Sequence, residues 1–331
     1  MKATAVAPAN IAFIKYWGKK DPSINLPFND SISMNLSRCL TTTTVEFSQK
    51  YKQSFSSNKR DEVYIRDEGK RATQRVVDHL ERIRKLGKSR LRAKVVSFNS
   101  FPSGVGIASS ASGFAALTLA ATVALGLKLS ERQLSILARL GSGSACRSVP
   151  DGFVEWKKGE SSQTSYALSL APEDFWDLRD IVVIVSLKKK KTSSLSGHAA
   201  ALTSPYFKER LKNLPKRILK VKEAIESKDI CLLGETSEEE AIDLHIIAMT
   251  SKPPIFYWEG KTLEIIKRVK EWREEGLAVY FTIDAGPNVH LICQGKDEEK
   301  VLKKLKEIKG IKQIIINKPA VGVRLVKEHL F

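Results

Sequence analysis

The stretch PSGVGIASSASGFAALTLAA, residues 102–121, joins a glycine-rich turn to a helix of small residues. Gly104 and Gly106 free the backbone of the turn, and Ser109 and Ser110 place hydroxyl groups where the helix begins. The first N–H groups of a helix have no partner within the helix, and the helix dipole favours an anion beside them. The stretch therefore predicts a phosphate-binding loop. A capped helix packed tightly through alanine and glycine is the structural alternative.

The loop matches neither of the two common nucleotide-binding motifs. No GK[ST] ends it, as a P-loop requires, and Ser109 stands where GxGxxG has its third glycine. Serine hydroxyls can still donate hydrogen bonds to phosphate oxygens or approach a metal ion. Phosphate binding at this loop therefore needs support from other segments.

A lone carboxylate stands in FTIDAGPNVH, residues 281–290. Asp284 follows an apolar run and precedes a Gly-Pro turn. A strand that delivers one acid to a turn is a common way to aim a base at a substrate. An Asx turn with Gly286 and Pro287 would use the same residues without any chemistry.

Two further segments carry hydrogen-bond donors that suit anions. NIAFIKYWGKKD spans residues 10–21, and GSGSACRS spans residues 141–148. An arginine among small hydroxyl residues can grip a carboxylate or a phosphate with two parallel hydrogen bonds. With the Gly-Ser loop and Asp284, these segments form a set that can bind two polyanions and place a base between them. The donors are Asn10, Lys15, Tyr16, Lys19, Ser142, Ser144, Arg147 and Ser148.

The chain has 331 residues, which is enough for about two domains, and a formal net charge of +18. Such a charge is also found in nucleic-acid-binding proteins. The basic residues are spread along the chain, however, and helical stretches such as VLKKLKEIK alternate them with glutamate. That alternation is typical of solvated, ion-paired faces. A positive field that steers small polyanions toward a cleft is the preferred interpretation.

Composition indicates a cytoplasmic protein without a membrane span. The longest small-apolar stretch, residues 111–127, is too short and too polar to cross a bilayer. The N-terminus lacks the order of charged and apolar residues found in a signal peptide. No CxxC spacing is present, which excludes the usual zinc patterns. The four cysteines are Cys39, Cys146, Cys231 and Cys293.

Helices interleaved with hairpin-like strands predict an α+β fold rather than a doubly wound sheet. The predicted domains are residues 1–187 and 188–331. The predicted strands cover residues 3–7, 31–36, 41–47, 63–65, 91–98, 153–156, 166–170, 181–187, 279–283, 289–293, 312–316 and 321–326. The predicted helices cover residues 76–86, 111–125, 131–140, 206–227, 230–249, 261–275 and 297–309.

Five segments resemble, in order, the signature blocks of the diphosphomevalonate decarboxylase family, which is part of the GHMP kinase superfamily. They are NIAFIKYWGKKD, FNDSISMNL, FPSGVGIASSASGFAAL, GSGSACRS followed after three residues by GFVEW, and FTIDAGPN. They extend over nearly the whole chain. The resemblance implies a two-lobed GHMP kinase fold. The N-terminal lobe would hold the glycine-serine phosphate loop, the C-terminal lobe would be ferredoxin-like, and the active site would lie in the cleft between them.

The resemblance implies ATP-dependent decarboxylation of (R)-mevalonate 5-diphosphate to isopentenyl diphosphate, with ADP, phosphate and CO₂ as the other products. ATP would be the co-substrate, Mg²⁺ would accompany its phosphates, and homodimers are common in the family. The nearest alternative is a sister enzyme on the same scaffold, either a phosphomevalonate decarboxylase or a mevalonate 3-kinase. A basic nucleic-acid-binding protein is the alternative from another class.

The resemblance also assigns roles to residues. Asp284 would orient or deprotonate the C3 hydroxyl, Lys15 would neutralise the transferring phosphoryl group, and Arg147 would hold the substrate carboxylate. Ser194, beside Ser193, matches a serine of the family's site. The other substrate-binding candidates are Asn10, Tyr16, Lys19, Ser142 and Ser144. The ATP-binding candidates are Ser103, Gly104, Gly106, Ala108, Ser109 and Ser110, of which Ser109 is also the candidate beside Mg²⁺.

Three segments depart from the family pattern. Pro150 and Asp151 precede GFVEW where an aromatic or aliphatic residue and a glycine are more common. His198 stands where a methionine is common, and the phosphate loop reads SGVGIASS rather than TAAGLASS. None of these departures removes a catalytic group, but the adenine contacts become harder to assign.

Overall fold

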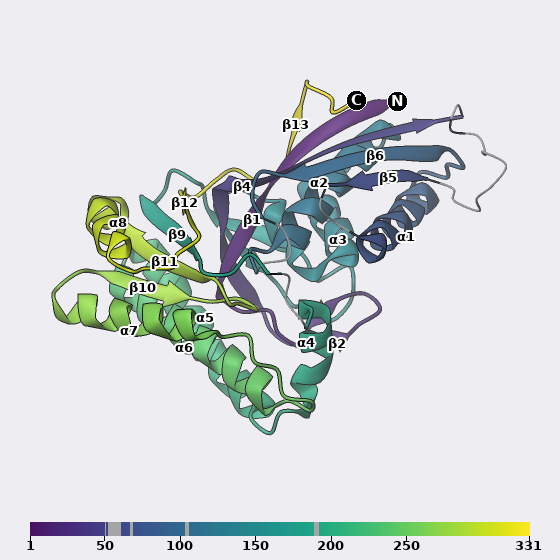
Figure 1. Cartoon of the computed structure of the whole chain (residues 1–331). Coiled ribbons are helices and arrows are strands. Elements are labelled where there is room, and N and C mark those ends of the chain that lie inside the picture. Colours follow the sequence, from purple (N-terminus) through teal and green to yellow (C-terminus); the bar gives the residue numbers. More distant parts are fainter. Residues whose placement is uncertain (50, 52–60, 67–68, 103–105, 189–191) are drawn as a thin grey trace.

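The structure is a computed structural model that describes residues 1–49, 51, 61–66, 69–102, 106–188 and 192–331. Two lobes are visible, each built on its own sheet (Figure 1). Strand pairs are antiparallel except for β5 (Glu62–Ile65) beside β6 (Arg92–Asn99). The predicted α+β fold is therefore confirmed.

A seven-stranded sheet forms the first lobe in the described part of the chain. Its main path runs β13 (Arg324–Val326), β1 (Lys2–Ile14), β4 (Ser31–Ser48), β6 and β5, while β7 (Phe153–Trp156) and β8 (Ala167–Ala171) extend from β4. The helices α1 (Lys70–Leu86), α2 (Ser109–Ala124) and α3 (Glu131–Gly141) belong to the same lobe. Alanines of α2 pack on alanines of β1, since small side chains let a helix approach a sheet closely.

Two strands of the first lobe are longer than predicted. The strand expected at residues 3–7 continues as β1 to Ile14, and the strands expected at residues 31–36 and 41–47 are one strand, β4. Both continue because their far ends are covered by the second lobe, so that apolar side chains are buried on both faces. The end of β1 therefore lies at the junction of the lobes.

The sheet of the second lobe has the order β10 (Val279–Thr282), β11 (Val289–Gln294), β9 (Leu178–Ile184) and β12 (Gln313–Asn317). One face packs against α7 (Gly260–Glu274) and α8 (Glu298–Lys306). The other face shares one core with α5 (Phe207–Ser227), α6 (Ile230–Thr250) and the ends of β1 and β4. This shared core joins the lobes and includes Ile11, Phe13, Ile32, Met34, Val182, Ile292 and Leu214.

Sheet membership differs from the predicted boundary at residue 187. The strand β9 precedes that boundary but pairs with β11 and β12 of the second lobe. Near the other end of the chain, β13 returns to pair with β1 of the first lobe. There Thr4 Oγ1 lies 2.7 Å from His329 Nδ1, and Lys2 Nζ donates to the carbonyl of Phe331 at 2.7 Å. The two ends of the chain are therefore neighbours (Figure 1).

Three shorter elements complete the surroundings of the site. A small hairpin joins β2 (Lys19–Asp21) to β3 (Leu26–Pro27), a 3₁₀ segment covers Gly143–Ser148, and α4 covers Ser194–Ala200. Among the described residues, no helix is long and apolar enough to cross a membrane.

Candidate active site

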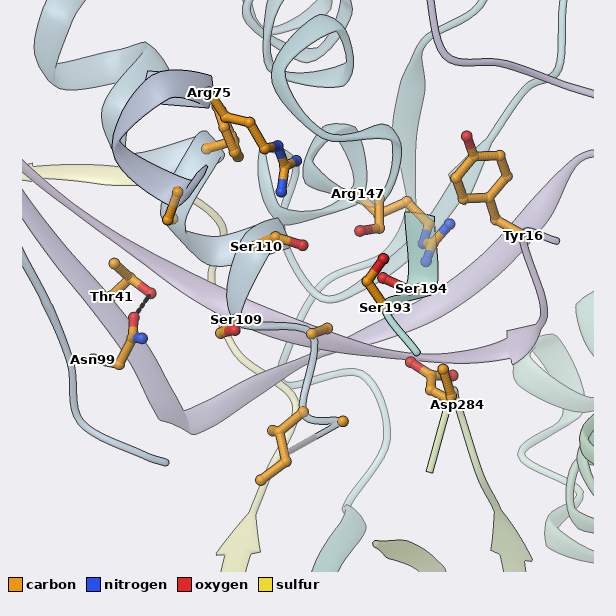
Figure 2. Close-up of a pocket in the computed structure, with 18 of the residues that line it drawn as sticks. Tyr16, Thr41, Arg75, Asn99, Ser109, Ser110, Arg147, Ser193, Ser194 and Asp284 are labelled. Atoms are coloured by element: carbon orange, nitrogen blue, oxygen red, sulfur yellow. Dashed lines mark hydrogen bonds between the residues drawn. The ribbon is translucent and has the colours of Figure 1, made fainter. Parts of the chain in front are cut away.

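A cavity of about 410 Å³ lies at the junction of the lobes. Figure 2 shows two groups of its lining residues with the start of α2 between them. The Asp284 end is formed by Tyr16, Arg147, Ser193, Ser194 and Asp284. The Arg75 end is formed by Thr41, Arg75 and Asn99.

An ion pair closes the Asp284 end. Lys15 Nζ lies 2.8 Å from Asp284 Oδ1 and donates to the carbonyl of Ala12 at 2.7 Å. The Lys15 side chain is 1% exposed and that of Asp284 is 26% exposed, so the carboxylate is open to the cavity while the ammonium lies beneath it. Lys15 follows the last residue of β1, and Asp284 lies just beyond the end of β10. The pair therefore joins the two lobes.

The ion pair changes the acidity of both groups. Burial raises the pKa of Asp284, but the adjacent Lys15 ammonium, together with His290 and Arg147, outweighs burial, so the pKa lies below its ordinary value. Burial lowers the pKa of Lys15, and Asp284 offsets this only in part. Asp284 is therefore a carboxylate that stays ionised at neutral pH and is a weak base in the resting site.

Arg147 is a buried cation without an acidic partner. Its guanidinium donates to Ser31 Oγ at 2.6 Å, Ser33 Oγ at 3.0 Å and Asn10 Oδ1 at 3.1 Å. The residue is 3% exposed, and no carboxylate in the described part of the chain forms an ion pair with it. Burial lowers the pKa of Arg147, and the negative charge of Asp284 offsets only part of this effect. An anion bound at this end of the cavity would supply the missing counter-charge.

The phosphate loop meets the Asp284 turn directly. Gly106 has φ +101° and Ala108 has φ 36°, and α2 begins at Ser109. A Cβ at Gly106 would lie 2.8 Å from the carbonyl oxygen of Gly286, so only glycine permits this approach. Gly106, Ala108, Ser109 and Ser110 all line the cavity. Ser103 and Gly104 lie outside the described residues.

Several other predicted site residues also line the cavity. Tyr16, Ser144, Ser193 and Ser194 do so, and the buried hydroxyl of Tyr16 has no hydrogen-bond partner among the described residues. Ser193 caps α4 by accepting from the backbone of Ser196 at 3.2 Å. A polar ligand of the cavity can therefore meet several serine side chains, while the phenol of Tyr16 is buried in the wall.

Three predicted residues stand behind the cavity wall. Asn10 accepts from Arg147 and donates to Ser148 Oγ at 2.9 Å, so it supports Arg147. Ser142 Oγ lies 3.3 Å from Ser110 Oγ. Lys19 does not line the cavity either, and its Nζ lies 2.6 Å from Asn25 Oδ1.

Lys19 nevertheless has an unusual acidity. Burial and the charge of Arg75 lower the pKa of Lys19 to about 8. Arg75 itself lines the cavity and donates to the carbonyl of Gly141 at 3.1 Å. Two cations thus lie within electrostatic reach of each other beside the cavity, which favours an anion between them.

The sequence motifs did not predict the residues at the Arg75 end of the cavity. Thr41 Oγ1 lies 2.6 Å from both Asn99 Oδ1 and Ser112 Oγ, and the guanidinium of Arg75 lies 4.8 Å from the ring centroid of Phe114. These residues come from strands and a helix that meet only in the folded chain, so no local pattern marks them. Apolar side chains also line this end, namely Ile65, Val76, Val95 and Leu117.

His198 is one of the positions that depart from the family pattern. Its Nδ1 accepts from the backbone of Gly18 at 3.1 Å, and its ring lies 4.3 Å from that of Tyr16. Burial lowers the pKa of His198 to about 3. The side chain is therefore neutral at physiological pH, and it packs much as an apolar residue would.

Comparisons with known proteins agree with this architecture. The model of the diphosphomevalonate decarboxylase-like N-terminal domain matches residues 7–167, and that of the mevalonate 5-diphosphate decarboxylase C-terminal domain matches residues 180–322. Diphosphomevalonate decarboxylase of Candida albicans is 36% identical over 323 residues, which cover 92% of this chain and 87% of the relative. The Saccharomyces cerevisiae protein of the same name is 35% identical over 326 residues, which cover 90% of this chain and 79% of the relative.

Solved structures agree as well. Mevalonate diphosphate decarboxylase from Staphylococcus aureus has a TM-score of 0.91 and 36% identity over 98% of both chains. MDDEF, solved in complex with MVAPP, AMPPCP and magnesium, has a TM-score of 0.91 and 36% identity over 99% of both chains.

The two lobes, with a phosphate loop facing an acidic turn across a shared cavity, define a protein of the GHMP kinase fold. Within that class, the matches to both domain models and to full-length relatives give a narrower result. The chain belongs to the diphosphomevalonate decarboxylase family.

The contact between the phosphate loop and the Asp284 turn leads to a prediction about Gly106→Ala. The new Cβ would strain the backbone by about 1–3 kcal/mol and push the loop away from Gly286. We expect kcat to fall by about tenfold or more, because displacement of a positioned group has a large kinetic cost. Steady-state kinetics and the melting temperature together measure the effect.

Gly126→Ala is the matched control. Gly126 also has positive φ, +76°, but its added Cβ would meet only the end of Met1 at 3.3 Å, and it does not line the cavity. It should lower the melting temperature without changing kcat. If Gly106→Ala behaved in the same way, the loop contact would have no role in turnover.

Proposed function

We propose that this chain catalyses the ATP-dependent decarboxylation of (R)-mevalonate 5-diphosphate to isopentenyl diphosphate, ADP, phosphate and CO₂. The observation that carries the proposal is the Asp284 end of the cavity. There an ionised carboxylate paired with Lys15 shares a space with Arg147, a cation that has no acidic partner. The family to which the chain belongs supports the same reaction.

Asp284 acts on the C3 hydroxyl of the substrate. A tertiary alcohol is a poor nucleophile, and a carboxylate that accepts its hydrogen bond aims the oxygen lone pair at the γ-phosphorus of ATP. Because Lys15 keeps the pKa of Asp284 below its ordinary value, the carboxylate is a weak base. The lowered pKa of Asp284 therefore favours a role in which the carboxylate orients the hydroxyl and accepts its proton late in the reaction.

Lys15 and Arg147 handle the charges of the reaction. The Lys15 ammonium lies beside Asp284 and offsets negative charge on the phosphoryl group as it moves to O3. The transfer forms an O3–P bond and releases ADP. The C3–O bond then breaks, and its electron pair leaves with the phosphate. The bond between C2 and the carboxylate breaks in turn, and its electron pair forms the C2–C3 double bond as CO₂ is released. Arg147 binds the carboxylate and holds it in place until that bond breaks.

ATP occupies the length of the cavity. The backbone at Gly106, Ala108 and Ser109 cradles its phosphates, and the Arg75 end, with its apolar and hydroxyl side chains, takes the nucleoside. A serine hydroxyl at the start of a helix is an oxygen ligand of the kind that Mg²⁺ accepts beside substrate phosphates, so Ser109 would hold the ion. Mg²⁺, when bound with ATP, offsets the negative charge of the phosphates.

The diphosphate of the substrate lies toward Tyr16 and Lys19. The Tyr16 hydroxyl is buried without a partner, and Lys19 is a cation close to the wall of the cavity. Ser142, Ser144 and Ser193 complete the polar surroundings, and Ser194 holds the substrate or the γ-phosphate. The homodimer and the cytoplasmic location expected from the sequence remain proposals.

Three substrates tested in parallel separate the alternatives. The protein is incubated with ATP, Mg²⁺ and mevalonate, its 5-phosphate or its 5-diphosphate, while ADP and CO₂ are both measured. We expect equal amounts of ADP and CO₂ with the diphosphate. ADP without CO₂ would identify a mevalonate 3-kinase, and CO₂ mainly from the monophosphate would identify a phosphomevalonate decarboxylase. No product from any substrate, with salt-sensitive binding to DNA or RNA, would favour the nucleic-acid-binding alternative.

Asp284→Asn tests the role of the carboxylate. Turnover should fall by about 10² or more, as is usual when a positioned acid–base group is lost, while ATP still binds. ADP and CO₂ should fall together, because phosphorylation precedes loss of the carboxylate. Asp177→Asn, which changes an exposed acid paired with Arg179, is the control and should keep normal turnover. A normal kcat in Asp284→Asn would remove Asp284 from its role.

The acidity of Lys19 predicts a pH dependence. Lysine is cationic below its pKa, so attraction to the phosphorylated substrate is complete below about pH 8 and is lost as the pH rises through about 8. Since kcat/KM reports ionisations of the free enzyme, it should fall over this range. Lys19→Arg should move that fall to higher pH, because arginine keeps its charge. Lys20→Arg, at an exposed lysine paired with Glu160, should leave the profile unchanged.

If the profiles of Lys19→Arg and the wild-type protein coincided, Lys19 would have no part in binding the substrate.

A further inference from the structure

The backbone N–H and C=O groups of Lys15 need hydrogen-bond partners from outside the sheet. The ladder between β1 and β4 ends with Ile14 opposite Ile32, so Lys15 follows the last paired residue. Its side chain is almost fully buried, and buried backbone N–H and C=O groups without partners are costly. The groups that satisfy Lys15 therefore decide where it lies.

Most of those groups come from the second lobe. Glu240 Oε2 of α6 accepts from the backbone N–H of Lys15 at 3.0 Å, and Arg210 Nη2 of α5 donates to its carbonyl at 2.9 Å. Arg210 Nη2 also donates to Glu240 Oε2 at 2.8 Å. From the first lobe, Asn29 Nδ2 donates to the same carbonyl at 3.0 Å. An ion pair thus grips both polar groups of one peptide segment.

The ion pair is out of contact with solvent. Arg210 is 2% exposed and Glu240 is 0% exposed. Burial raises the pKa of Glu240, but Arg210, together with Arg217, outweighs burial, so the net shift is downward and Glu240 is ionised. A buried pair of this kind contributes little net stability compared with apolar residues of similar size. Its contribution here is geometric, since two fixed charges hold one segment in place.

We propose that Arg210 and Glu240 are positioning residues for the reaction, which fix the main chain of Lys15 so that its ammonium stays beside Asp284. Asp284 belongs to the second lobe, as Arg210 and Glu240 do, whereas Lys15 belongs to the first. The clamp, meaning Arg210 and Glu240, therefore holds Lys15 in the frame of the lobe that carries Asp284. The inference rests on the proposed function, because it concerns the same pair of groups.

Arg210→Lys is the first test, because lysine keeps the charge but its side chain is one bond shorter, so its ammonium falls short of the place of Nη2, the nitrogen that donates to both acceptors. We expect kcat to fall by about tenfold or more, since small displacements of reacting groups are costly, with little change in the KM for ATP. Glu240→Gln replaces the carboxylate by a neutral amide of similar shape, and it should have the same kind of effect. Steady-state kinetics at a temperature where each variant remains folded measures both.

A second measurement separates positioning from general destabilisation. Asp284 is faced by the cations Lys15 and Arg147 and by the imidazole of His290, and of these groups Lys15 does most to lower the pKa of Asp284. When Lys15 is displaced, the acid limb of the kcat profile should move to higher pH. Crystal structures of the variants should show Lys15 Nζ beyond hydrogen-bond distance from Asp284.

Arg84→Lys is the matched control. Arg84 is also a buried arginine, paired with Asp61 at 2.8 Å, and Asp61 also accepts a backbone N–H, that of Ala93, at 2.9 Å. This pair lies in the first lobe and does not line the cavity. Arg84→Lys should lower the melting temperature and leave kcat and the acid limb unchanged.

Two results together would contradict the positioning role of the clamp. Arg210→Lys and Glu240→Gln would lose only stability, as we expect for Arg84→Lys, and their crystal structures would keep the Lys15–Asp284 contact. A wild-type protein that released no CO₂ from any substrate would contradict the proposed function instead. The distance between Lys15 Nζ and Asp284 in the variant structures would still decide whether the clamp positions Lys15.

Discussion

Burial of the Lys15 ammonium is the constraint on which the centre of the molecule depends. A charged amine out of water is costly unless anionic and hydrogen-bonding groups surround it. Here Asp284 and the carbonyl of Ala12 meet the ammonium, while Arg210 and Glu240 grip the main chain. Because these groups come from both lobes, the charge is satisfied only when the lobes are packed together. The shared hydrophobic core and the ion pair therefore favour the same arrangement.

Sequence patterns could predict those site residues whose neighbours in the sequence form a recognisable turn or helix start. Asp284 stands on a turn after an apolar strand, Ser109 begins a helix of small residues, and Arg147 lies among glycine and serine. Local geometry decides what such residues can present to a ligand, and the structure brings them around one cavity. The α+β class was also predictable, because the alternation of strand and helix patterns extends along the whole chain.

Other features depend on contacts between distant parts of the chain. Glu240 belongs to the run SEEE, which by itself favours a solvated helix face, but it is buried where Arg210 and Arg217 of another helix form ion pairs with it. Arg75 and Asn99 reach the cavity through the packing of α1 and β6, and no local pattern distinguishes them. The boundary predicted at residue 187 separates β9 from the strands that pair with it, because those strands lie more than 100 residues later in the chain.

The return of β13 to β1 has a consequence for the order in which the protein can be completed during synthesis. The chain leaves the ribosome from its N-terminus, so the edge of β1 emerges early and receives its neighbouring strand only when residues 324–326 appear. Until then, an open strand edge is available for pairing with other chains. The strands of the second sheet, residues 178–317, are all made before that moment. The second lobe can therefore assemble while the first still lacks its last strand.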